Sequence, residues 1–289
     1  MPRRRRTAGL DPVTQHADIY RTLALYEFPW DLNQALSFAL FRTFAVPSIG
    51  GLLDRTHEFT ARTQQRYDDT SLLLEVPLVE GADSPRGRAA IRRINQMHRM
   101  YDIGNDDMRY VLATFVVCPT RWVAAYGWRD LTDDERTATV HYYAEVGRLM
   151  GIRDLPTSYA AYEQLMDSYE REHFAYDAGS RRVADATLDL LTTFYPRGTR
   201  RAVRASSLAL MDDALLDALG YPRPSARARR LATGALRARG RLVRLLPPRR
   251  RPAYVRDQRR IRSYPDGFVV EEMGTHVPGC PVPHARRGA

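Results

Sequence analysis

The 289-residue sequence contains no lysine, so all 44 of its lysine-plus-arginine positions are arginines. This absence excludes Schiff-base catalysis, a lysine ligand to a metal and a phosphate-binding P-loop. Cysteine is scarce as well: Cys118 and Cys280 are too few for a disulfide framework and are typical of a reducing compartment. We therefore expect a cytoplasmic protein.

Long apolar runs are also missing. Mean hydropathy is −0.45, and no run reaches the roughly 18 apolar residues that a membrane span requires. The basic start, MPRRRRTAGL, is followed by no apolar segment, so no export signal is expected. The motifs of covalent haem attachment, zinc proteases, dinucleotide binding and serine hydrolases are all absent.

The positive charge is concentrated at one end of the chain. Residues 222–289 hold 17 arginines against four acidic residues, whereas residues 1–221 sum to −3. We expect a basic N-terminal tail (1–9), a helical body (10–221) and an Arg/Pro-rich C-terminal extension (222–289) whose middle forms a basic amphipathic helix. Such an extension can attract anionic lipid and place the protein at the inner face of a membrane, and nucleic acid is not the expected partner.

The body is predicted to be helical throughout. Apolar residues recur every three or four positions, as on one face of a helix, and the alternating patterns of strands are nearly absent. The expected fold is therefore all-α in one large domain. Thr132 and Glu135 have the spacing of a capping box. The segment 108–117, MRYVLATFVV, is apolar nearly all round and predicts a buried helix that stops at Pro119.

Three histidines fall on apolar helix faces: His98, His141 and His173. A neutral imidazole there can be a metal ligand, or simply a buried histidine satisfied by a neighbour. Glu170 and His173 form a Glu-x-x-His pair, the spacing found in di-iron bundles. A non-haem oxygenase centred on this pair is one alternative function, and a non-catalytic protein that binds through the basic extension is another.

A polar cluster, QQRYDDT (64–70), precedes an apolar run. It predicts either a loop with a helix cap or a site in which Arg66 and Thr70 face a pocket as charge and hydrogen-bond donors.

Four segments carry a family resemblance: YEFPWDLNQALSFALFRTFAVPSIGGLLDRT, RYDDTSLLLEV, RINQMHRMYDIGNDDMRYVLATFVVCPTRW and AEVGRLMGIRDLPTSYAAYEQLMDSYEREHF. Over roughly residues 10–220 the chain resembles the MpaB/rubber-oxygenase family, and is closer to the MpaB branch. The resemblance implies an all-helical protein with non-covalent haem b. It also implies that the protein uses dioxygen to cleave a carbon–carbon double bond of a hydrophobic, isoprenoid substrate.

The resemblance also assigns residues. The family's proximal haem ligand is the histidine of a Met-His pair, which is Met97-His98 here. Rubber oxygenases carry a second axial lysine in an Arg-x-x-Lys-Thr segment, and Asp69 stands at that position between Arg66 and Thr70. We expect His98 to bind the iron, with Met97, Thr114 and His173 contacting the cofactor and with Arg66 and Thr70 as catalytic donors.

Overall fold

The structure is a computed structural model in which residues 6–275 are described. Most of the basic N-terminal tail and residues 276–289, including Cys280, lie outside this range. Within it the chain forms α-helices and short 3-10 or π turns and no strand, which confirms the all-α prediction. The elements are α1 (His16–Thr22), η1 (Leu23–Glu27), α2 (Pro29–Phe44), α3 (Pro47–Arg55), α4 (Glu58–Ala61), α5 (Thr63–Glu80), α6 (Pro85–His98), α7 (Asn105–Tyr126), α8 (Asp133–Leu149), α9 (Tyr159–His173), α10 (Ala178–Thr192), η2 (Arg197–Thr199), α11 (Arg200–Ala209), α12 (Asp213–Ala218), α13 (Ala226–Leu245) and η3 (Val270–Glu272).

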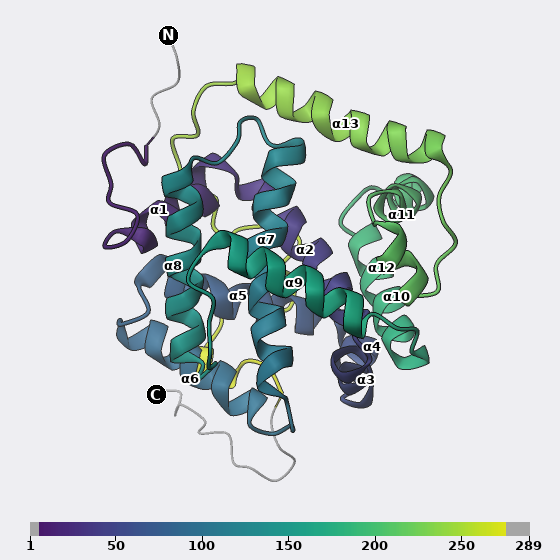
Figure 1. The fold of residues 1–289 in the computed structure, drawn as a ribbon, viewed down its shortest axis with the longest axis horizontal. Helices are drawn as coiled ribbons and strands as arrows, with labels where there is room; N and C mark the ends of the chain where they lie inside the picture. The colour runs from purple at the N-terminus through teal and green to yellow at the C-terminus, as the bar shows by residue number, and fades with distance from the viewer. Residues whose placement is uncertain (1–5, 276–289) are drawn as a thin grey trace.

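Helix α7 is the centre of the molecule, with α2, α8 and α9 packed around it (Figure 1). Its apolar residues are buried on several sides, as the sequence predicted. The predicted stop at Pro119 is wrong, because the helix continues to Tyr126. A proline removes one backbone hydrogen bond, but burial of Trp122 and Val123 in the next turn holds the helix together.

Helix α8 begins at the capping box that its sequence predicts. The Thr132 hydroxyl accepts a hydrogen bond from the Glu135 backbone N–H at 3.1 Å, and the Glu135 carboxylate accepts one from the Thr132 N–H at 3.0 Å. Two otherwise unsatisfied donors at the helix start are thereby paired. This fixes the orientation of α8 along one side of α7.

The helix predicted for the C-terminal extension is present, but it lies near the start of the extension, as α13 (Ala226–Leu245), rather than in its middle. Helix α13 crosses one edge of the molecule, from the α11–α12 group to the end of α7 (Figure 1). Gly240 is buried where the helix meets the end of α7, and a Cβ atom there would collide with the Tyr126 carbonyl. Arg239 donates to both carboxylate oxygens of Asp31 at 2.6 and 2.7 Å. The helix is thus docked on the body at specific residues.

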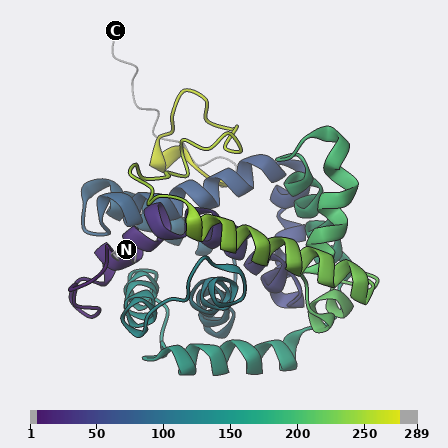
Figure 2. The ribbon, with the colours of Figure 1, turned by 90° about the horizontal axis from the view of Figure 1, so that it is seen from above.

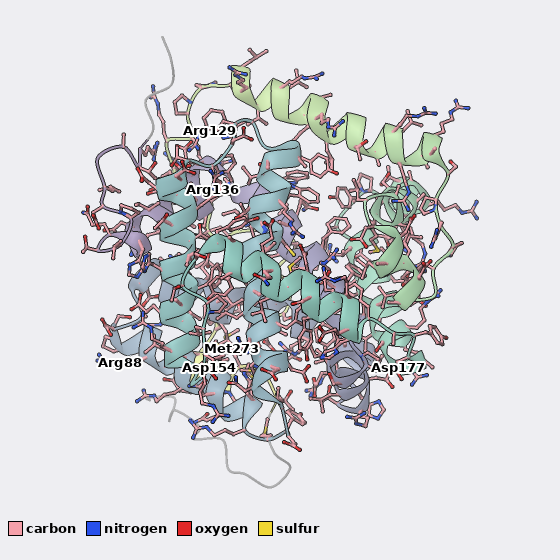
Figure 3. The ribbon with its side chains drawn as sticks, in the orientation of Figure 1. Arg88, Arg129, Arg136, Asp154, Asp177 and Met273 are labelled. Atoms are coloured by element: carbon pink, nitrogen blue, oxygen red, sulfur yellow. The ribbon has the colours of Figure 1, made fainter. Side chains whose placement is uncertain are left out.

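The chain then returns as a strap, residues 253–275, against α5 and α6 (Figure 2). Val270 and Met273 are 2% and 0% exposed in a cluster with side chains of those helices. Figure 3 labels Met273, whose side chain is fully buried. Asp68 accepts hydrogen bonds from the backbone N–H groups of Arg262 and Ser263, both at 3.0 Å. The strap is therefore an integral part of the core.

Candidate functional site

An apolar cavity of about 260 Å³ lies among α2–α8, close to the 300–1,000 Å³ typical of small-molecule sites. Its walls are mainly leucine, isoleucine, methionine, valine and phenylalanine side chains, including Leu73, Ile94, Met97, Val111, Leu112 and Phe115. Polar side chains also line it, among them His98, Arg66 and Thr70 and the acidic residues Glu58, Asp102 and Asp107. The structure therefore gathers four of the six predicted site residues, Arg66, Thr70, Met97 and His98, at one apolar cavity.

His98 is the last residue of α6, and its side chain faces this cavity. Its Nδ1 atom is buried and has no hydrogen-bond partner. Burial, reinforced by the positive charge of Arg66, lowers the pKa of His98 from 6.5 to about 4. The imidazole is therefore neutral at pH 7, so one of its two ring nitrogens carries the lone pair that metal ligation requires.

Arg66 and Thr70 lie one turn apart on α5. The loop interpretation of residues 64–70 is wrong, because α5 runs from Thr63 to Glu80. The Arg66 guanidinium donates to the Thr70 hydroxyl, and burial lowers the pKa of Arg66. Arginine stays protonated at any physiological pH. Within residues 6–275, Arg66 forms no direct ion pair with a carboxylate, but the charges of Asp69 and Glu58 act on it, and Glu58 lines the same cavity.

Asp69, at the position of the second axial lysine in the family resemblance, does not line the cavity. It points to the strap and accepts a hydrogen bond from the Tyr264 hydroxyl. Burial raises the pKa of Asp69 despite this hydrogen bond and the nearby charge of Arg66. The side chain at this position therefore serves to fasten the strap.

Thr114, His141 and His173 lie away from the cavity lining. Thr114 is 1% exposed, and its hydroxyl donates to the Val111 carbonyl at 2.7 Å within α7. The His141 ring lies 6.1 Å from that of His16. His173 packs edge-on against Tyr169 at 4.0 Å, in a shallow surface depression. The roles predicted for Thr114 and His173 in holding a cofactor have no geometric support from these positions.

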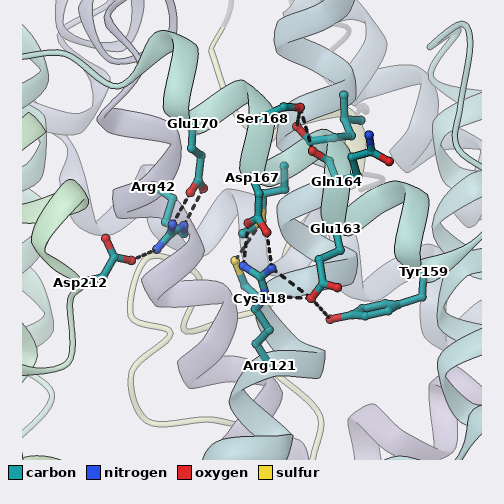
Figure 4. Close-up of polar contacts among 12 residues, drawn as sticks. Arg42, Cys118, Arg121, Tyr159, Glu163, Gln164, Asp167, Ser168, Glu170 and Asp212 are labelled. Atoms are coloured by element: carbon teal, nitrogen blue, oxygen red, sulfur yellow. Dashed lines mark hydrogen bonds and ion pairs between the residues drawn. The ribbon is translucent and has the colours of Figure 1, made fainter.

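Glu170, the acid of the Glu-x-x-His pair, forms a buried ion pair with Arg42. Its carboxylate oxygens accept hydrogen bonds from Arg42 Nε at 2.6 Å and from Arg42 Nη2 (Figure 4). The Tyr110 hydroxyl donates to the same carboxylate at 3.1 Å. In the part of the chain that the structure describes, no three His, Cys, Asp or Glu side chains gather as a metal site. Glu170 therefore forms a structural ion pair with Arg42 and, within residues 6–275, is not part of a di-iron site.

The strap also forms part of the cavity wall, which sequence reasoning missed. Thr275 lines the cavity, and a Cβ atom on Gly274 would collide with Met97 Sδ. Arg93 fixes this end of the strap by donating to the carbonyl oxygens of Met273 and Thr275 at 2.6 and 2.7 Å. The apolar run FVV (268–270) in an otherwise arginine-rich extension was the available signal that the segment is buried.

Comparison with known protein families identifies the fold. Residues 37–245 match the model described as ER-bound oxygenase mpaB/B'/rubber oxygenase, catalytic domain. The chain belongs to this family. It is 29% identical over 221 residues to the ER-bound oxygenase mpaB of Penicillium roqueforti, covering 70% of this chain and 74% of that protein. It is also 28% identical to mpaB' and 29% identical to mpaB of Penicillium brevicompactum, over 80% and 73% of this chain.

Membership of the mpaB/rubber-oxygenase family makes the matched segment an oxygenase catalytic domain, and the chain an oxidoreductase. The chain spans 59% of the length of each of the two P. brevicompactum relatives. Both cavity-lining helices with the candidate site residues, α5 and α6, lie within the matched segment, whereas the strap lies beyond its end.

The predicted cytoplasmic location is contradicted by the relatives. All three are named ER-bound, which points to association with the endoplasmic reticulum membrane. Between residues 6 and 275, no single helix has the length and apolarity to cross a bilayer. The bent pair α2 and α3, with 94° between them, meets the criterion jointly by length and composition only. The scarcity of cysteine, which suggested the cytoplasm, does not distinguish it from a membrane surface that faces the cytoplasm.

Proposed function

We propose that this protein is a haem b-dependent oxygenase in which His98 is the protein ligand to the iron. The supporting observation is the buried, unpartnered Nδ1 of His98 at the wall of an apolar cavity. A buried polar atom without a partner in the protein requires an explanation, and for His98 the explanation we propose is a bound cofactor. Histidine is the proximal ligand to the iron in several classes of haem protein.

The residues around His98 supply the kinds of contact that a bound porphyrin uses. Ile94, Met97 and Val111 provide apolar surface for the macrocycle, and Arg66 provides a positive charge for an anionic group. When bound, haem b supplies a redox-active iron that activates dioxygen. The surrounding apolar side chains exclude water, which would otherwise compete for the iron and quench reactive species.

Arg66 and Thr70 are proposed as the catalytic donors. Both face the cavity from α5, and their mutual hydrogen bond holds the guanidinium and the hydroxyl in fixed positions. A charged donor in a site of low dielectric stabilises negative charge as it develops on oxygen, more strongly than it would in water. Asp69, at the position of the family's second axial lysine, is bonded to Tyr264 of the strap and does not line the cavity.

The proposed substrate is a hydrophobic molecule, of the isoprenoid type that the family resemblance implies, and the proposed reaction is oxidative cleavage of a carbon–carbon double bond. The lining of the cavity supports an apolar substrate because burial of its hydrocarbon surface, at about 25 cal/mol per Å², would drive binding.

An absorption spectrum with a pyridine haemochrome assay tests this proposal. Purified wild-type protein should show a Soret band and about one haem b per chain, His98→Ala should lose more than about nine-tenths of it, and His173→Ala should retain it. His173 is a matched control because it also ends a helix, but at the molecular surface. Protein that contains iron without a Soret band, or haem that survives in His98→Ala, would contradict the assignment.

We further propose that α13 contacts the surface of a membrane. Its outer face carries leucines that solvent reaches, with Leu231, Leu242 and Leu245 exposed by 65%, 64% and 82%. Exposed arginines flank them, among them Arg227, Arg230, Arg237, Arg241 and Arg244. An exposed helix with an apolar stripe between arginines is typical of segments that lie in the headgroup layer of an anionic bilayer.

Vesicle sedimentation tests this surface. Full-length protein should bind vesicles that contain 30% phosphatidylserine more tightly than vesicles of pure phosphatidylcholine, and 0.5 M NaCl should weaken the binding. Leu242→Glu combined with Leu245→Glu should reduce binding about tenfold or more. Leu149→Glu, which alters a 40%-exposed leucine at the far end of α8, is the control and should bind normally. Equal binding by both variants, or tighter binding to RNA than to vesicles, would argue against a lipid surface.

A further inference from the structure

A second cavity, of about 130 Å³, adjoins the one beside His98. The two share six lining residues: Leu40, Thr70, Leu74, Phe115, Tyr143 and Val146. The second cavity, here called the inner chamber, lies between α2 and α5 and has mostly apolar walls, with Leu25, Leu32 and Leu36 among them. The six shared side chains therefore place the two cavities on either side of one wall.

The strap closes one side of the inner chamber. Ala253, Val255 and Gln258 form part of the lining. The Ala253 N–H donates to the Leu25 carbonyl at 2.9 Å, and Glu75 accepts hydrogen bonds from the backbone N–H groups of Val255 and Arg256. The chamber is therefore completed by residues beyond the segment that the family model covers.

One polar atom in the inner chamber has no partner. Asn33, on α2, lines the chamber, and its Oδ1 is buried without a hydrogen bond. The neighbouring hydroxyl groups already have partners. The Ser37 hydroxyl donates to the backbone carbonyl of Asn33 at 2.9 Å, and it lies 3.2 Å from the Tyr67 hydroxyl. The amide oxygen of Asn33 thus remains as the single free acceptor among these three side chains.

Asn33 lies well beyond the shared wall. It precedes Leu40 by two turns of α2, which is roughly 10 Å at 1.5 Å per residue. A ligand that reaches from the His98 cavity to Asn33 must therefore be elongated, apolar along its length and a hydrogen-bond donor at its far end.

We propose that the inner chamber binds the distal part of a linear apolar molecule that ends in a hydroxyl group, with Asn33 Oδ1 accepting a hydrogen bond from that hydroxyl. The inference deepens the proposed function, on which it rests, because it assigns a polar end group to the hydrophobic substrate and places it away from His98. A buried acceptor in an apolar chamber favours a donor strongly, since any other group leaves the acceptor unsatisfied.

Calorimetric titration with two probes, 1-decanol and 1-methoxydecane, tests this inference. The ether has a similar chain but no proton to donate. Wild-type protein should bind decanol about tenfold more tightly than the ether, which corresponds to one neutral hydrogen bond. In Asn33→Leu this preference should vanish because decanol binding weakens, while the exposed Gln164→Leu variant should keep it. Leu36→Trp, which fills the chamber, should weaken both probes.

Equal affinity for the two probes in wild-type protein, or an unchanged preference in Asn33→Leu, would overturn the inference, and the wild-type comparison decides the matter even if a variant fails to fold. Haem content of the same samples separates this result from the proposed function. A decanol preference in wild-type protein without a Soret band would refute the haem assignment alone. A Soret band without the preference would refute the inner chamber alone.

Discussion

Replacing Arg42 with methionine should destabilise the protein by about 3–5 kcal/mol, measured by urea unfolding. Arg42, on α2, donates to Glu170 on α9 and to Asp212, at 2.5 Å, at the start of α12 (Figure 4). Glu170 is only 7% exposed. Removal of the guanidinium leaves a buried carboxylate with only the Tyr110 hydroxyl as a partner, and an unpaired buried charge is one of the costliest defects in a folded protein.

A second arginine on the same side of the molecule provides the control. Arg121 is bonded to Glu163 and Asp167, but its side chain is 40% exposed and both acids are 38% exposed (Figure 4). Solvent screens such pairs, so Arg121→Met should change stability by about 1 kcal/mol or less. Adding Glu170→Gln to Arg42→Met should restore part of the loss by removing the charge. Equal effects of Arg42→Met and Arg121→Met would show that burial of the Glu170 pair is not what makes it strong.

Replacing Met273 with alanine should cost about 2–5 kcal/mol of stability, although the residue lies in an arginine-rich extension. Met273 is fully buried against α5 and α6, and it immediately precedes Gly274, which packs on Met97 in the cavity wall. The truncation leaves a void in the core and loosens the strap where it meets the site. Thermal unfolding should show a decrease in Tm of several degrees or more.

Val269 offers the comparison for this strap variant. It is 47% exposed, whereas the neighbouring Val270 is 2% exposed. Val269→Ala should change stability by no more than about 0.5 kcal/mol, as is usual for surface positions. If Met273→Ala is as harmless as Val269→Ala, the strap does not form part of the core, and its contribution to the two cavities must be withdrawn.

The helical body could be predicted from the sequence because its signals are local. The Thr132–Glu135 capping box and the apolar spacing around His98 depend on residues within a few positions of each other, and helix periodicity places them on one face. The continuation of α7 through Pro119 could not be predicted, since it depends on burial of Trp122 and Val123 against other helices.

The strap was beyond prediction for a related reason. Asp68, Asp69 and Glu75 hold it through partners almost 200 residues away in the chain, and two of the three bind backbone groups that carry no sequence signal. When a helix is buried on all sides, the periodicity of its sequence does not show which side faces a cavity. Thr114 is as buried as the apolar residues around it, but it faces its own helix backbone.

The central claim is that a nitrogen of His98 binds haem iron, and chemical rescue of His98→Gly tests it most directly. This variant leaves an imidazole-sized space at the end of α6. Purified without imidazole it should show almost no Soret band, and 10–50 mM imidazole with added haemin should restore about one haem per chain, because the free base occupies the vacated position. A Soret band in His98→Gly that is unchanged from the wild type without imidazole would contradict the account.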